Sequence, residues 1–401
     1  MKGNLGLSMA LLTAVLAGPA AAQGDLGSAY DETTYIFDWR VRYEGVDQAG
    51  FGQDANALTS RVRAGFESGA VAGTKLLAEL VGTSELSNEF NSTTNGQTEY
   101  PVVADPGGFA EINRFALINQ SLEKTKLTLG RQRLILDDAR FVGNVGWRQN
   151  EQTFDGLVSQ TTGEKFAADF AYFNQVNRIF GPDSPNGEWN GDVVLLRGSR
   201  SFGFGRLTAF AYGMEFDEAP AASNETIGLT LSGSKAFGET SLIYTLAAAS
   251  QSEAGLNPVD YSESYSKLEG GVSRGPVTVA LGMEILGGDG TIAFATPLAT
   301  LHAFQGWADK FLTTPVNGIE DGYLRFAWRP SATGPFESIN VSGFYHDFAA
   351  DAGTADYGDE IDLSVAARSG RTTLTLKYAA YEAEGLFTDT DKLWFSMDYA
   401  F

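Results

Sequence analysis

The feature that most constrains this chain is an alternation of apolar and charged side chains at every second residue, in segments of about ten residues. In residues 35–44, Phe37 and Trp39 stand at odd positions, whereas Arg40 and Arg42 stand at even ones. Residues 58–67 and 323–329 repeat this split. Because successive side chains of a β-strand point to opposite faces, the pattern predicts strands with one apolar and one charged face. A soluble β-sandwich also alternates, so the pattern alone does not decide the architecture.

Segment length and loop length favour a transmembrane barrel. About ten residues are enough for a tilted strand to cross the hydrocarbon core, whereas strands of soluble sheets average about five or six. Short turns, such as residues 236–239, alternate with long loops, such as residues 84–109, as in outer-membrane barrels. We therefore predict an all-β fold, a transmembrane antiparallel β-barrel of about 18 strands, with about 16 as the alternative. The predicted strands begin near Tyr35, Leu58, Lys75, Glu111, Lys126, Gln152, Lys165, Asp192, Gly205, Thr226, Thr240, Tyr261, Val277, Asp321, Ser338, Glu360, Thr372 and Lys392.

The end of the chain supports the same architecture. Segment 392–401 carries apolar side chains at alternate positions and finishes on Phe401. It resembles the last strand of bacterial outer-membrane barrels, whose terminal Phe is recognised by the barrel assembly machinery. We therefore expect outer-membrane lipid and this machinery as partners, the latter through Phe401.

The beginning of the chain has the order of a signal peptide. Lys2 precedes an apolar run that is too short to span a bilayer, and small residues at Ala20–Ala22 follow. We predict a signal peptide at residues 1–22 and a single barrel domain at residues 23–401; a buried N-terminal helix is the alternative. An exported barrel of this kind belongs in the outer membrane of a Gram-negative bacterium.

Composition excludes several kinds of function. The chain has 28 Lys and Arg against 50 Asp and Glu, a formal net charge of −22, which disfavours nucleic-acid binding. It has no cysteine, which excludes disulfides, thiol nucleophiles, Cys-ligated zinc and iron–sulfur clusters. We expect no nucleic-acid partner and no cofactor.

Residues 129–155 contain the most distinctive motif of the chain. Its parts are Gly130-Arg131-Gln132, the turn Asp137-Asp138-Ala139-Arg140-Phe141-Val142-Gly143, Trp147-Arg148, and Gln152-Thr153-Phe154-Asp155. This stretch resembles the alginate export family of outer-membrane porins, and residues 296–312 resemble a long loop of proteins assigned to that family. The resemblance implies an 18-stranded barrel and an arginine-lined pore for a polyuronate.

The arginines are the candidate solute contacts. A charge that faces lipid costs about 2–4 kcal/mol at mid-bilayer, so we expect them to face the lumen, where guanidinium groups can bind carboxylates. The predicted pore residues are Arg131, Arg133, Arg40, Arg42, Arg61, Arg63, Gln132, Arg140 and Arg148. The alternative is that these arginines brace the wall by pairing with Asp38, Glu44, Glu67, Asp137, Asp138 and Asp155.

Other candidate sites are weaker. His302 and His346 lack the neighbours that catalytic motifs require, so we expect no enzyme. Asp351, Asp356 and Asp359 have oxygen ligands suited to Ca²⁺ but not the spacing of a known calcium loop, and a solvated loop is the alternative. Loop 287–319 is predicted either to enter the pore as a plug or to remain on the surface.

The sequence therefore predicts a porin that passively conducts a polar, anionic solute, either an alginate-like polyuronate or a smaller organic anion or oligosaccharide. The alternative is a barrel that its own loops close, acting as a surface scaffold or adhesin without transport. The direction of flow and the oligomeric state are left open.

Overall fold

The structure, a computed structural model, describes residues 26–401, so the predicted signal peptide at residues 1–22 lies outside the described residues. Within the described part, no helix has the length and hydropathy needed to cross a bilayer. The strands are β1 (Thr34–Gln48), β2 (Ala55–Glu67), β3 (Thr74–Glu85), β4 (Phe109–Asn119), β5 (Thr125–Gln132), β6 (Thr153–Thr162), β7 (Phe166–Asn177), β8 (Glu188–Phe202), β9 (Gly205–Phe216), β10 (Asn224–Phe237), β11 (Thr240–Glu253), β12 (Ser262–Arg274), β13 (Val277–Leu286), β14 (Ile319–Trp328), β15 (Ser338–Ala349), β16 (Asp356–Ser369), β17 (Thr372–Ala383) and β18 (Thr390–Ala400). The helical turns are α2 (Leu26–Asp31), η1 (Pro220–Ala222) and η2 (Leu301–Ala303).

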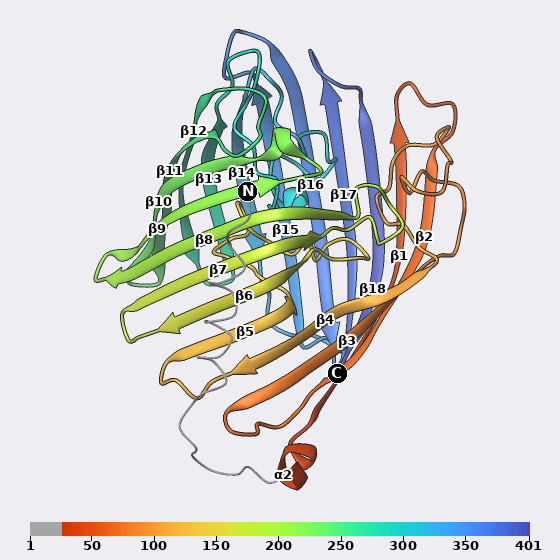
Figure 1. Ribbon diagram of the computed structural model, residues 1–401. Helices are drawn as coiled ribbons and strands as arrows, with labels where there is room; N and C mark the ends of the chain where they lie inside the picture. The colour runs from red at the N-terminus through yellow and green to blue at the C-terminus, as the bar shows by residue number, and fades with distance from the viewer. Residues whose placement is uncertain (1–25) are drawn as a thin grey trace.

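These strands form a closed antiparallel barrel (Figure 1). Each strand pairs with its sequence neighbours, and β1 also pairs with β18, with Trp39 opposite Tyr399. The prediction of an all-β barrel with 18 strands is confirmed, and the alternative of about 16 is wrong. Each predicted strand start lies within four residues of the observed one; the largest offsets are at β8 and β16.

The two faces of the wall differ as the alternation predicts. Outward-facing Leu229, Leu246 and Leu281 are 53%, 45% and 66% exposed. Many inward-facing positions carry polar and charged side chains, with Arg42 and Arg61 each 1% exposed, and others carry buried apolar side chains such as Phe210 that pack against the inner loops. An apolar outer belt with a polar interior is the arrangement of outer-membrane barrels, because lipid replaces water on the outside only.

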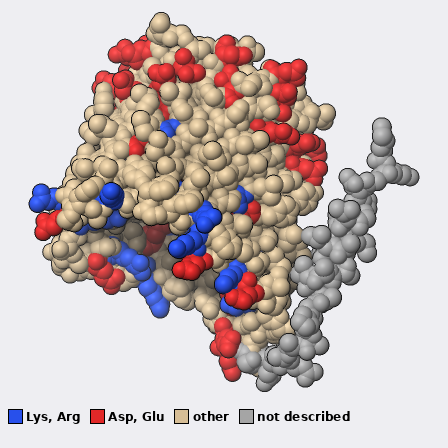
Figure 2. All heavy atoms as spheres, turned by 90° about the vertical axis from the view of Figure 1, so that its left-hand side faces the viewer, with Lys and Arg blue, Asp and Glu red and all other residues tan. Residues whose placement is uncertain are grey.

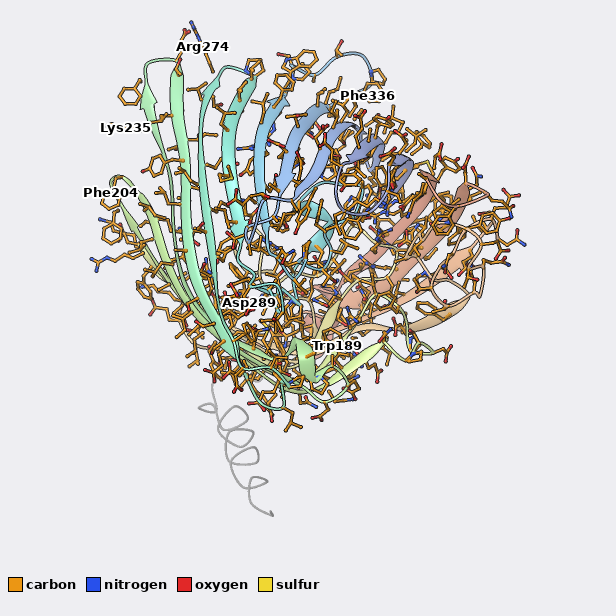
Figure 3. The ribbon with its side chains drawn as sticks, turned by 90° about the horizontal axis from the view of Figure 1, so that it is seen from above. Trp189, Phe204, Lys235, Arg274, Asp289 and Phe336 are labelled. Carbon is orange, nitrogen blue, oxygen red and sulfur yellow. The ribbon has the colours of Figure 1, made fainter. Side chains whose placement is uncertain are left out.

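The two ends of the barrel carry different charges. Most connections at one end are short turns, which we call the short-turn end; the long-loop end carries the extended loops. Figure 3 shows Phe204 in a short turn and Lys235 and Arg274 beside short turns, far from Asp289 in a long loop and from Trp189 at the start of β8. In Figure 2 a hollow on the side of these turns has Lys and Arg together with Asp and Glu around it, whereas mostly Asp and Glu gather over the upper surface.

Two long loops fold back into the barrel. The first inner loop (residues 133–152) and the second inner loop (residues 287–318) meet inside the lumen, where Val142 forms a parallel bridge with Leu298. Both of these side chains and Phe294 are fully buried. The structure thus places most of the predicted loop 287–319 inside the pore, and not on the surface.

The outer belt makes a testable prediction. Leu246 faces outward halfway along β11, and its neighbour Thr245 faces inward. We expect Leu246→Arg to lower the free energy of unfolding by about 2–4 kcal/mol, because the guanidinium enters lipid. Thr245→Arg should have little effect. Urea unfolding of the refolded protein in lipid vesicles measures both, and equal losses would contradict the assignment of faces.

Candidate functional site

Four arginines on adjacent strands form what we call the basic wall of the lumen: Arg40 and Arg42 on β1, Arg61 and Arg63 on β2. Arg40 lies directly opposite Arg61 across the two strands, and both side chains point inward. Like charges that face each other across a strand pair are unfavourable. Arg40 offsets part of this repulsion by pairing with Asp398 on β18.

Acidic neighbours pair with only some of the guanidinium nitrogens of the basic wall. Arg61 hydrogen-bonds to Asp38, and an Nη atom of Arg42 lies 3.6 Å from a carboxylate oxygen of Asp105. Even so, all three guanidinium nitrogens of Arg42 and two nitrogens each of Arg61 and Arg63 have no hydrogen-bond partner within the described residues. Buried donors without partners are rare and costly in proteins. These nitrogens are enclosed by protein, so the basic wall holds positive charge that its carboxylates do not fully engage.

Glu151 attaches the first inner loop to this wall. Its carboxylate accepts hydrogen bonds from Arg133, with a 2.7 Å contact to Nε, and from Asn113 at 2.7 Å. Arg63 lies 3.5 Å from the same carboxylate. Burial alone would raise the pKa of Glu151, but Arg63 and Arg133 lower this pKa to about 2. Glu151 is therefore ionised over the whole physiological range and holds the loop against β2.

Trp147 and Arg148 make the second attachment of this loop. The Arg42 guanidinium lies 3.9 Å from the centre of the Trp147 ring, a cation–π contact. Arg148 donates to Glu44 on β1 at 3.2 Å and to Asp309 of the second inner loop at 2.7 Å. Arg148 thus joins both inner loops to the wall of the barrel.

The second inner loop is fixed by His302 and Asp309. Nδ1 of His302 lies 2.7 Å from Asp309, and Nε2 lies 2.6 Å from Nζ of Lys377 on β17. Burial lowers the pKa of His302 to about 3, despite the opposing effect of Asp309. A neutral ring fits both contacts, because Nδ1 then donates to Asp309 while Nε2 accepts from Lys377. Lys392 on β18 adds a third contact to Asp309, at 2.9 Å.

Four carboxylates form an acidic wall on β13, β14 and β16: Glu284, Asp321, Glu360 and Asp362. Glu360 accepts the backbone N–H of Ala308 at 2.7 Å, so this wall also holds the second inner loop. Arg140 of the first inner loop donates to Glu284 at 2.8 Å. The lumen is therefore mixed in charge, with four arginines on β1 and β2 and further cations such as Lys377 on β17 and Lys392 on β18.

The structure separates the predicted pore residues into three groups. Arg40, Arg42, Arg61, Arg63 and Arg133 lie together at the basic wall. Arg140 and Arg148 are buried in ion pairs that fix the loops. Gln132 points inward, but its amide is used by the carbonyl oxygens of Thr128, Gly130 and Gly156.

Arg131 does not face the lumen, contrary to expectation. It shares the outward face with Leu129 and lies opposite Phe115, which is 54% exposed. Two 2.8 Å hydrogen bonds pair it with Asp155, and an Nη atom donates to the carbonyl oxygen of Ile112 at 3.2 Å. This pairing neutralises the charge and fills the wall where β5 ends, which explains how an arginine is accommodated on the outer face.

The calcium hypothesis does not fit the geometry. Among residues 26–401, no three acidic or histidine side chains are arranged to hold a metal ion. Asp359 faces outward, opposite Asp347 and Glu382 on the adjacent strands, away from any common centre with Asp351.

Sequence reasoning missed several residues of the site. Lys377 and Lys392 stand on inward-facing positions of β17 and β18, and Glu360 and Asp362 stand two residues apart on β16. Alternation could have identified these charges as lumen residues by the same argument that selected Arg61 and Arg63. Their contacts with loop residues leave no signal in the sequence.

The role of Arg148 can be tested by stability. Arg148→Met removes the cation between Glu44 and Asp309, and breaking a buried ion pair costs about 3–5 kcal/mol. We expect a lower Tm and faster hydrogen exchange within residues 133–152. Arg274→Met, at an exposed short turn, is the control and should change neither. Unchanged exchange in the Arg148 variant would show that other contacts fix the loop.

Glu151 predicts a pH dependence. Its pKa is depressed in the folded protein, so its stabilising contribution is complete above the unfolded value of about 4.5. This contribution is lost as the pH falls towards about 2. The difference in Tm between the wild-type protein and Glu151→Gln should therefore be constant above pH 5 and shrink below it. A difference that stays constant down to pH 2 would contradict an ionised Glu151.

Comparison with known proteins supports the fold. No family model matches the chain, and no curated protein matches it. Among solved structures, the outer membrane protein OpdK of Pseudomonas aeruginosa is 14% identical with a TM-score of 0.70, covering 93% of this chain and 99% of its own. OpdO of the same organism is 13% identical with a TM-score of 0.73, covering 94% and 98%, and OccK9 (OpdG) is 17% identical with a TM-score of 0.72, covering 93% and 100%. OccAB4 of Acinetobacter baumannii is 13% identical with a TM-score of 0.69, covering 92% and 98%. The chain thus has the fold of outer-membrane porins and, with its apolar belt, is an outer-membrane β-barrel.

Proposed function

We propose that this protein is a channel that passively conducts small organic anions across the outer membrane, with the basic wall and Arg133 as their contacts. The observation that carries the proposal is the excess of guanidinium groups at this wall. Nitrogens of Arg42, Arg61 and Arg63 have no hydrogen-bond partner within the described residues, and the side chains of Arg40 and Arg133 are 15% and 29% exposed. Carboxylates match guanidinium groups in shape and charge. Several such donors along a wall give weak binding at successive positions, which allows a solute both to enter and to leave.

The inner loops favour small solutes over long polymers. They join separate parts of the wall, β1 through Arg148 and β13 through Arg140, and their centre is packed with buried aromatic side chains. The similar protein OpdK has a crystal structure with vanillate, a small carboxylate. We therefore favour a monomeric acid over alginate, the polyuronate that the resemblance of residues 129–155 suggests. If no solute passes, the alternative function holds instead, in which the loops close the barrel.

Charge selectivity tests the role of the basic wall. In planar bilayers we expect the double variant Arg63→Gln/Arg133→Gln to reduce the permeability ratio of anions to cations several-fold, because two lumen cations are lost. The control is Arg131→Gln/Asp155→Asn, which removes an outward-facing ion pair and should leave the reversal potential unchanged. An unchanged reversal potential in the first variant would contradict the proposed pore contacts, and absence of conductance in the wild-type protein would favour the closed barrel.

A further inference from the structure

A second group of polar side chains faces the lumen on β9 to β12, away from the basic wall. The strand register aligns Arg206 with Ser232, and Ser232 with Thr245. The next inward row aligns Thr208 with Thr230. These rows line a cavity of about 270 Å³ near the short-turn end, which we call the turn-side cavity. The hollow in Figure 2 opens on the side of these turns.

The hydroxyl groups of this cavity are free. Thr208, Thr230, Ser232 and Thr245 make no side-chain hydrogen bond to any described residue, although all four line the same space. Free hydroxyl groups can each donate and accept a hydrogen bond. Four of them on adjacent strands form a surface suited to a ligand that is itself rich in hydroxyl groups.

The cavity is also lined by two cations, Arg206 and Lys267, that have few or no ion-pair partners. Arg206, at the start of β9, has no ion pair within the described residues. Lys267, on β12, has only a distant carboxylate, Glu284, at 3.9 Å. The acidic residues at the cavity are already engaged: Asp137 pairs with Arg197, and Asp138 accepts the backbone N–H of Arg140. A carboxylate that enters therefore meets unpaired positive charge.

Aromatic side chains close the cavity on the side of the inner loops. Phe141 of the first inner loop packs on Phe210 and Tyr265, with ring centres 4.9 and 5.3 Å apart. Arg140 lies beneath the second inner loop in the same region, paired with Glu284. A solute on the short-turn side of Phe141 is thus separated from the basic wall by packed rings.

We propose that the turn-side cavity is a second solute-binding site, which takes a single small polyhydroxylated carboxylate such as a sugar acid. The carboxylate contacts Arg206 and Lys267, and the solute's hydroxyl groups contact Thr208, Thr230, Ser232 and Thr245. The volume of about 270 Å³ lies near the lower end for ligand pockets, about 300 Å³, which limits the occupant to one sugar-sized unit. This inference rests on the proposed channel function, because the solute reaches the cavity through the lumen.

The test uses D-glucuronate, D-glucose and benzoate as probes. Their binding to the refolded full-length protein in detergent is measured by saturation-transfer NMR, which requires no conduction. Arg206→Gln removes the free cation, and Thr208→Val/Thr230→Val removes two hydroxyl groups with little change of shape. Lys235→Gln is the control, because Lys235 lies at the same end of the barrel on the outward face of β10.

We expect Arg206→Gln to weaken glucuronate binding about tenfold, as is typical for loss of a hydrogen bond to a charged group. The double valine variant should weaken glucuronate and glucose several-fold and leave benzoate unchanged. Lys235→Gln should change none of the three. Unchanged glucuronate binding in both cavity variants would overturn the second site, and so would equal losses of benzoate and glucuronate in the valine variant.

These outcomes are separable from those of the proposed function. If the wild-type barrel conducts no ions but still binds glucuronate through Arg206, the channel function fails and the binding site stands. If the wild-type barrel conducts anions but glucuronate does not bind, the second site fails alone.

Discussion

Backbone hydrogen bonding in lipid is the constraint on which this structure depends. An unpaired N–H or C=O group in hydrocarbon costs several kcal/mol, so a sheet that crosses the membrane must close on itself. Here β1 meets this requirement by pairing with both β2 and β18. Closure also separates an outer face, which lipid keeps apolar, from an inner face, where charges collect. The basic wall therefore depends on closure of the barrel, because Arg40, Arg42, Arg61 and Arg63 occupy inward positions of the first two strands.

A barrel of this size has a lumen that its strand side chains do not fill, and the inner loops occupy the remaining space. Buried charges in these loops are tolerated because they are paired: Arg140 with Glu284, Arg148 with Glu44 and Asp309, and Glu151 with Arg133. Pairing accounts for almost the whole mixed interior. Several nitrogens of Arg42 and Arg61 depart from this rule, because they have no hydrogen-bond partner within the described residues, although Arg42 stacks on Trp147 and Arg61 pairs with Asp38.

The strands could be predicted from sequence because lipid imposes a pattern that is local. Tight turns fix the starts of β9, β11 and β17 at Gly205, Thr240 and Thr372, and these were predicted without error. The prediction that Arg131 faces the lumen was wrong. It relied on the general cost of exposing a charge to lipid and ignored the alternation of inward and outward side chains in β5. Leu127, Leu129 and Arg131 alternate on one face, and the pairing with Asp155 lowers the cost that the argument assumed. Contacts between a loop and a distant strand, such as His302 with Lys377, depend on how the loop folds inside the barrel and leave no periodic signal.

The distribution of free polar groups argues for a path with two successive sites and not for a single tight one. Unpaired guanidinium nitrogens mark the wall of β1 and β2, and free hydroxyl groups mark β9 to β11 beyond Phe141. A single site with all of these donors would hold an anion too strongly to release it, whereas two weaker sites allow exchange between them. The packed rings of Phe141, Phe210 and Tyr265 are the element that must move for that exchange. Phe141 stands next to Arg140, which pairs with Glu284 on β13 and hydrogen-bonds to Thr296 and Gln305 of the second inner loop, so a movement of these rings would act on the contact between the two loops.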